Sequence, residues 1–282
     1  MLGPQIIVRS LSHAAIKDSF GNLWQYHSRS DRHSKIACWA MLFDLLRKCP
    51  VLVEQIERDA IGFGINHEMR DFRTARKKNL DLVICTPGPG GAGKRANFAD
   101  LVTKYDIRLT PAERREFDAI PALRQAPVGS VHLALEAKAC MTAHIAALPR
   151  LYDELNSSHA AIHGSSDLAT AVGFVMVNVA DTFVSPDRNR RKRGRKAFEV
   201  TTLTQPHDTE RTIEKVKEVP RRTQSNAEGY DALGIVVVCM ANDGTPVTLV
   251  TEPPAPADRD LWSYDQMIRR MASLYASKFR NV

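Results

Sequence analysis

The chain has 282 residues, of which 44% are hydrophobic and 25% are charged, and its formal net charge is +7. This length and composition allow one large domain or two small ones and exclude collagen-like, coiled-coil and wholly disordered chains. No run approaches 18 consecutive apolar residues and the N-terminal segment lacks a secretory signal, so we expect no membrane-spanning helix. Five cysteines without a CxxC pair favour reduced thiols and a cytoplasmic location.

The positive charge is concentrated in one segment, 188–196 (RNRRKRGRK), whose seven basic residues equal the net charge of the whole chain. These residues are Arg188, Arg190, Arg191, Lys192, Arg193, Arg195 and Lys196. Such a cluster predicts contact with a polyanion, and nucleic acid is the first candidate. No aromatic residue lies among them, so base stacking is not expected there. A solvated loop without a partner is the alternative.

In the first third of the chain, the apolar spacing predicts a helix over 34–48, ended by Cys49-Pro50, and a second short helix over 51–59. Two strand-like runs follow within 69–87. In the second run, Leu80, Leu82 and Ile84 are expected on one face, with Asp81 on the other.

In the middle of the chain, 130–139 (SVHLALEAKA) is the clearest predicted strand. A helix over 141–155 and a strand over 171–180, buried on both faces, follow it. The segment 156–167 reads as a loop.

The C-terminal third predicts helices over 209–219 and 225–233, a strand over 234–240, a turn at 242–244, a returning strand over 245–251, and a final helix capped by Ser263. The whole pattern predicts a single α/β domain over 1–282, with a mixed central sheet flanked by helices. Insertions are expected at 86–128 and 183–224.

The chemistry is predicted from residues of two strands. Glu136 and Lys138 are two residues apart in a strand, so both project from one face, together with His132. Asp81 is an acid within another apolar strand. If these strands are neighbours, two carboxylates and an ammonium converge, and such oxygen ligands suit Mg²⁺, for which Mn²⁺ can substitute.

These residues resemble the PD-(D/E)xK nuclease superfamily, which includes many restriction endonucleases. The resemblance covers roughly 66–180, although Leu80 stands in place of the proline and 55 positions separate Asp81 from Glu136. It implies a restriction-endonuclease-like fold in which Asp81, Glu136 and the Ala137 carbonyl hold the metal and Lys138 is the catalytic lysine. The implied function is that of a Mg²⁺-dependent DNA endonuclease, most simply a homodimeric type II restriction enzyme that cuts double-stranded DNA.

Several alternatives stay open. The segment 88–94 (GPGGAGK) fits a phosphate-binding loop of a nucleotide hydrolase, but Arg95 replaces the Ser or Thr that would bind Mg²⁺. A non-catalytic DNA-binding protein would use the basic segment alone. Glu54, Glu57 and Asp71 are candidates for an additional acidic residue of the site. His159 and His163 are four residues apart, which is a metal-ligand spacing if they are helical, but they stand in a predicted loop.

Overall fold

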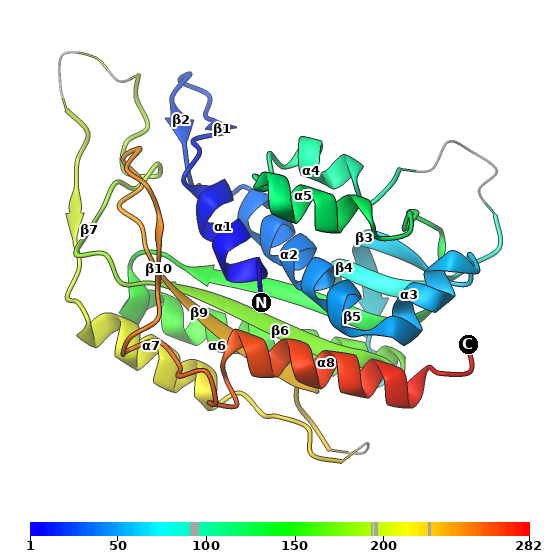
Figure 1. The fold of residues 1–282 in the computed structure, drawn as a ribbon. Helices are drawn as coiled ribbons and strands as arrows, with labels where there is room; N and C mark the ends of the chain where they lie inside the picture. The colour runs from blue at the N-terminus through cyan, green and yellow to red at the C-terminus, as the bar shows by residue number, and fades with distance from the viewer. Residues whose placement is uncertain (91–95, 193, 195–196, 225–226) are drawn as a thin grey trace.

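A computed structural model of the chain places six strands in one mixed sheet with helices on both faces (Figure 1). It describes residues 1–90, 96–192, 194, 197–224 and 227–282. The strand order is β10-β9-β6-β5-β4-β3. These strands are β3 (Gly62–Arg70), β4 (Lys77–Pro87), β5 (Val128–Cys140), β6 (Thr170–Asn178), β9 (Ala232–Cys239) and β10 (Thr248–Val250). The predicted α/β class and mixed sheet are therefore confirmed.

The helices form layers on the two faces of the sheet (Figure 1). One face is covered by α1 (Gly3–Leu11), α2 (Arg32–Lys48), α3 (Pro50–Glu57) and α8 (Tyr264–Lys278), and the other by α6 (His144–Ser165) and α7 (His207–Lys217). Two short helices, α4 (Asp100–Lys104) and α5 (Pro111–Asp118), belong to the first side. Two small strand pairs lie outside the sheet: β1 (Ile16–Lys17) with β2 (Leu23–Trp24), and β7 (Thr182–Phe183) with β8 (Thr201–Thr202).

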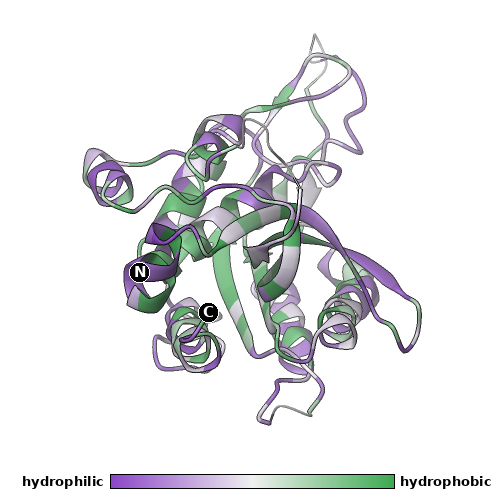
Figure 2. Cartoon of the chain, turned by 90° about the vertical axis from the view of Figure 1, so that its right-hand side faces the viewer, coloured by the Kyte–Doolittle hydropathy of each residue, from purple (hydrophilic) through white to green (hydrophobic). Residues whose placement is uncertain are grey.

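The central strands are parallel and the outer ones antiparallel. β3, β4 and β5 form an antiparallel meander, β5, β6 and β9 are parallel, and β10 returns antiparallel to β9. Every residue of β6 is buried, as expected for a strand covered on both faces. Figure 2 shows hydrophobic residues concentrated in these central strands and hydrophilic ones in the surrounding loops.

Two predicted elements differ from the structure. The segment 156–165 continues α6 and is not a loop, because Leu155, His159 and Ile162 are buried at helical spacing against the sheet. The predicted helix over 225–233 is wrong in its described part. There, Tyr230 exchanges backbone hydrogen bonds with Pro220 and Arg222, and β9 begins at Ala232.

Strand irregularities change the predicted faces. β5 carries one extra residue opposite the step from Ile84 to Cys85, and this β-bulge reverses the face of the residues before it. His132 therefore stacks on Phe279 of α8, with ring centroids 4.4 Å apart, and does not share the face of Glu136. Leu80 likewise lies in the α6-side core, whereas Leu82 and Ile84 lie in the α2-side core.

The described residues 96–127, between β4 and β5, pack against α2 through Phe98 and Phe117. Phe98 stacks on Trp39 with ring centroids 5.3 Å apart, and Thr110 and Glu113 form the predicted capping box of α5. Residues 91–95, with Lys94 of the phosphate-loop alternative, lie outside the described residues. The next helix along the chain, α4, has five residues and begins at Asp100, so it does not open at Lys94 as such a loop requires.

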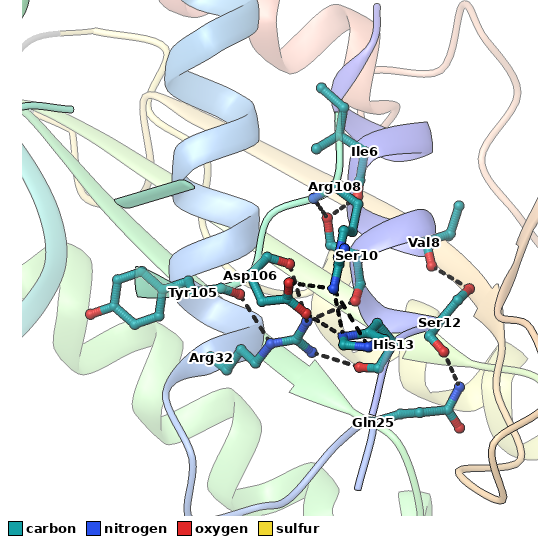
Figure 3. Close-up of polar contacts among 10 residues, drawn as sticks. All are labelled: Ile6, Val8, Ser10, Ser12, His13, Gln25, Arg32, Tyr105, Asp106 and Arg108. Atoms are coloured by element: carbon teal, nitrogen blue, oxygen red, sulfur yellow. Dashed lines mark hydrogen bonds and ion pairs between the residues drawn. The ribbon is translucent and has the colours of Figure 1, made fainter. Parts of the chain in front are cut away.

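Arg32 fixes the start of α2 (Figure 3). Its guanidinium is buried, and it donates to the carbonyls of Ser10, His13 and Tyr105 at 2.8, 3.3 and 3.0 Å. It also lies 3.4 Å from the carboxylate of Asp106. One planar cation thus joins the end of α1, the first turn of α2 and the segment after α4.

We expect Arg32→Lys to lower the free energy of unfolding by about 1–2 kcal/mol, because an ammonium cannot reach the three carbonyls that the guanidinium binds. Urea titration of both proteins measures the difference. Arg58→Lys is the control, since Arg58 is 71% exposed on α3, and its effect should stay within about 0.5 kcal/mol. Equal effects in the two variants would contradict the role of Arg32.

Candidate active site

Asp81 and Glu136 lie where β4 and β5 separate. The pairing of the two strands ends at Leu82 and Leu135, one residue short of the two acids. Asp81 Oδ2 still reaches across and accepts a hydrogen bond from the Ala137 amide at 3.0 Å. The fold therefore brings together the two strands that the sequence analysis pairs for chemistry.

Two residues of the first turn of α2 contact Asp81. Its Oδ1 accepts from the Ser34 hydroxyl at 2.9 Å and from Lys35 Nζ at 2.7 Å. Lys35 is 3% exposed and also donates to Asn66 Oδ1 at 2.5 Å. Burial acts to raise the pKa of Asp81, but the charge and hydrogen bond of Lys35, with the Ala137 amide and Ser34, lower it below its usual value. Asp81 is therefore held as a carboxylate.

Glu136 and Lys138 project together on the α6 side of β5, as predicted. Lys138 Nζ lies 2.7 Å from Glu136 Oε1 and 3.2 Å from Glu154 Oε2, and Arg150 Nε contacts the other oxygen of Glu154 at 2.7 Å. Burial lowers the pKa of Lys138, but the two glutamates raise it above its usual value. Lys138 is thus a fixed cation between two carboxylates.

Glu136 has one carboxylate oxygen that is buried and, within the described ranges, without a partner. It is 2% exposed, and its Oε2 is buried without a hydrogen-bond partner among the described residues. Burial raises the pKa of Glu136, and the charge of Asp81 adds to this effect against the opposing charge of Lys138. A buried carboxylate oxygen without a donor is costly, so the atom is available for a cation or a ligand.

A pocket of about 410 Å³ surrounds these groups. It is lined from α2 by His33 and Ser34, from β4 and β5 by Asp81, Glu136 and Lys138, and from α6 by Arg150 and Glu154. Tyr26 and Ser28 close one side. The pocket is polar at its floor and open to solvent through partly exposed Lys138 and Glu154.

Lys35, Ser34 and Glu154 are not among the predicted site residues. A signal for Lys35 is present in the sequence, because it stands four residues before Trp39 and seven before Leu42, on the apolar stripe of α2. A lysine on a buried stripe needs an anionic partner. Glu154 carries no comparable signal, since it stands among other polar residues of α6.

The further acids and histidines are accounted for elsewhere. Glu54 is 60% exposed and pairs with Arg58, and Glu57 is exposed on the same helix. Asp71 accepts from the Arg73 amide and the Thr74 hydroxyl, so it stabilises the β3–β4 turn. His159 contacts Asn156, and His163 contacts Gly229 and Arg222, so the two imidazoles have other partners. These are structural roles.

Asp81 and Glu136 are the residues of the pocket that could hold a hard cation. A carboxylate offers about four acceptor positions, of which Asp81 uses three and Glu136 one. Within the described ranges, no three His, Cys, Asp or Glu side chains are grouped to hold a metal ion. Mg²⁺ binds through one or two carboxylates and keeps several waters, so Asp81 and Glu136 meet its needs.

The basic segment begins beside this pocket. Ser28, which lines the pocket, donates to Asp187 at 2.7 Å, and Asp187 also contacts Arg190 at 3.1 Å. The described residues 184–192 and 197–200 lie near the β1–β2 hairpin (Figure 1), where Asn22 donates to the Arg191 carbonyl and Phe198 stacks on Trp24. Arg188 pairs with Glu199, and Lys192 is exposed. The predicted contacts Arg193, Arg195 and Lys196 lie outside the described residues.

Comparisons with known proteins give no assignment. No family model, curated protein or solved structure matches this chain. Within the described parts, no helix is long and apolar enough to cross a bilayer. All five cysteines are free thiols, and four of them are buried.

Three histidines predict acid sensitivity. Burial lowers the pKa of His33, His132 and His163 to about 4 each, with Arg222 adding to the effect at His163. The unfolded chain binds protons below pH 6.5 while the folded one does not, so stability is complete above pH 6.5 and declines toward pH 4. We expect the free energy of unfolding to fall by at least about 2 kcal/mol between pH 7 and pH 4.5. Urea titrations across this range measure it, and His132→Gln should flatten the decline, whereas exposed His207→Gln should not.

Proposed function

We propose that this chain is a Mg²⁺-dependent endonuclease that hydrolyses phosphodiester bonds in DNA. The observation that supports it best is the buried, partnerless Glu136 Oε2, which lies on the strand pair that also carries Asp81 and Lys138. Further support is the chain order α2, α3, β3, β4, β5, α6 and β6, with α4 and α5 inserted between β4 and β5, because the PD-(D/E)xK resemblance implies a helix, a strand pair, the ExK strand, a helix and a strand in that order.

The residues have separate roles in this reaction. Asp81, Glu136 and the Ala137 carbonyl would hold Mg²⁺, which supplies Lewis-acid stabilisation of the scissile phosphate. Lys138 would orient the attacking water and offset negative charge in the transition state. Glu154 keeps the Lys138 ammonium in place, and Lys35 keeps Asp81 ionised and aligned with β5. Attack in line with the leaving oxygen completes the cleavage.

The basic segment 188–196 would contact DNA phosphates beside the pocket. Its support is the Ser28–Asp187 contact, which joins the root of the segment to the pocket wall. By analogy with the PD-(D/E)xK enzymes that cut duplex DNA with one reacting centre for each strand, we expect a homodimer. Restriction of foreign DNA in the cytoplasm, by a type II enzyme, is the role that fits this chemistry.

Incubation of the purified chain with supercoiled plasmid tests the proposal. Wild-type protein should cut the plasmid with Mg²⁺ or Mn²⁺ and not with EDTA, and Lys138→Ala should remove the activity. Binding without cleavage, unchanged in Lys138→Ala, would instead support a non-catalytic DNA-binding protein. ATP hydrolysis lost in Lys94→Ala would support the nucleotide hydrolase.

A further inference from the structure

A second and larger hollow adjoins the candidate active site. It measures about 880 Å³ and runs along α6, where it is lined by the β3–β4 turn and by Arg222, Ala227 and Glu228. Arg150 and Glu154 line both this groove and the active-site pocket. We call this hollow the α6 groove. A DNA strand that leaves the active-site pocket on the α6 side therefore enters it.

Arginines reach the α6 groove from three parts of the chain. Arg73 and Arg76 come from the β3–β4 turn, Arg150 from α6 and Arg222 from the opposite wall. Arg150 is already paired with Glu154. Arg73 Nε lies 3.4 Å from Asp71 Oδ1, but its side chain is 66% exposed. Arginine is the side chain best suited to bind phosphate, because its planar donors match two phosphate oxygens.

Arg222 is the residue of the α6 groove that most strongly indicates a bound anion. It is 4% exposed, its Nη1 contacts His163 Nδ1 at 2.5 Å, and its Nε donates to the Gln224 carbonyl at 3.2 Å. In the described part of the chain, no carboxylate lies within 4.0 Å of its guanidinium. A buried cation without a counter-ion is costly unless a bound anion supplies the missing charge.

Four acidic residues also line the groove, namely Asp153, Glu154, Asp167 and Glu228. Its charges therefore nearly balance, so a general positive field does not attract the ligand. Recognition has to come from the individual arginine positions, each of which can bind one phosphate of a strand.

We propose that the α6 groove binds backbone phosphates of the DNA strand that passes through the active site, with Arg222 as the buried anchor and Arg73 and Arg76 on the opposite wall. This inference rests on the proposed nuclease function. It adds a substrate-binding subsite on the side of the pocket that carries Arg150 and Glu154. Asp187, just before the basic segment, contacts Ser28, which lines the same pocket.

DNA binding without cleavage tests the subsite. Affinity for a 20-base-pair duplex is measured in EDTA over a range of salt concentrations. Arg73→Gln/Arg76→Gln should weaken binding about 10-fold and reduce the slope of log affinity against log salt by about 0.9 for each lost phosphate contact. Arg222→Gln should weaken binding to a similar extent. Arg58→Gln, on α3, is the matched control and should change neither quantity.

The outcomes separate the subsite from the nuclease. Unchanged affinity and slope in Arg73→Gln/Arg76→Gln would overturn the subsite, even if Arg222→Gln fails to fold. Saturable binding of AMP that depends on Arg222 and does not compete with DNA would also overturn it and indicate a small-ligand site. Failure of wild-type protein to cleave, with the arginine effects intact, would overturn the nuclease and leave a DNA-binding groove.

Discussion

Glu136→Gln should lower the rate of Mg²⁺-dependent DNA cleavage by about 10³-fold or more without lowering the stability of the fold. The rate falls because the amide no longer offers a charged ligand, and the lost charge stabilisation is worth about 4 kcal/mol. Stability is retained because the substitution removes a buried charge whose Oε2 has no partner among the described residues. Lys138 keeps a carboxylate partner in Glu154 at 3.2 Å.

Single-turnover cleavage and urea titration on the same preparation measure both effects. Glu57→Gln, an exposed acid of α3, is the control and should leave cleavage and stability unchanged. Glu154→Gln should have an intermediate effect of about 10-fold, because Lys138 then keeps only Glu136. Cleavage at the wild-type rate by Glu136→Gln would show that Glu136 is a structural residue.

Local patterns were sufficient to predict the strands that carry the chemistry. β5 was predicted because alternation over 130–139 is regular from Leu133 onward, and Glu136 and Lys138 fall within that regular part. β6 was predicted from its continuous apolar run. That run is present because both faces of the strand are buried. In these cases, tertiary packing and local pattern agree.

The irregular positions could not be predicted in this way. The extra residue in β5 turns His132 toward α8, and no feature of the sequence SVHLAL marks that bulge. The C-terminal part of α6 could not be predicted because its small polar residues resemble a loop. It is stabilised by burial of Leu155 and Ile162. Lys35 reaches Asp81 only because α2 packs across β4 and β5, and that is a long-range property of the fold.

Lys35→Met should lower the free energy of unfolding by about 3 kcal/mol, because it leaves the buried carboxylate of Asp81 without its cation. The Lys35 ammonium makes three contacts with Asp81 and Asn66 that a thioether cannot replace. Lys77→Met is the matched control. Lys77 pairs with Glu68 at a similar distance of 2.7 Å, but both side chains are more than half exposed, so its loss should cost less than about 1 kcal/mol.

A double-mutant cycle with Asp81→Asn measures the interaction between Lys35 and Asp81. If Lys35 serves to balance Asp81, Lys35→Met should cost far less in the Asp81→Asn background than in the wild type, because the uncompensated charge is then absent. Equal costs in both backgrounds would mean that Lys35 stabilises α2 in another way. The pair also sets where Asp81 lies relative to the Ala137 amide, so Lys35→Met should weaken Mn²⁺ binding, measured by calorimetry, in the fraction that remains folded.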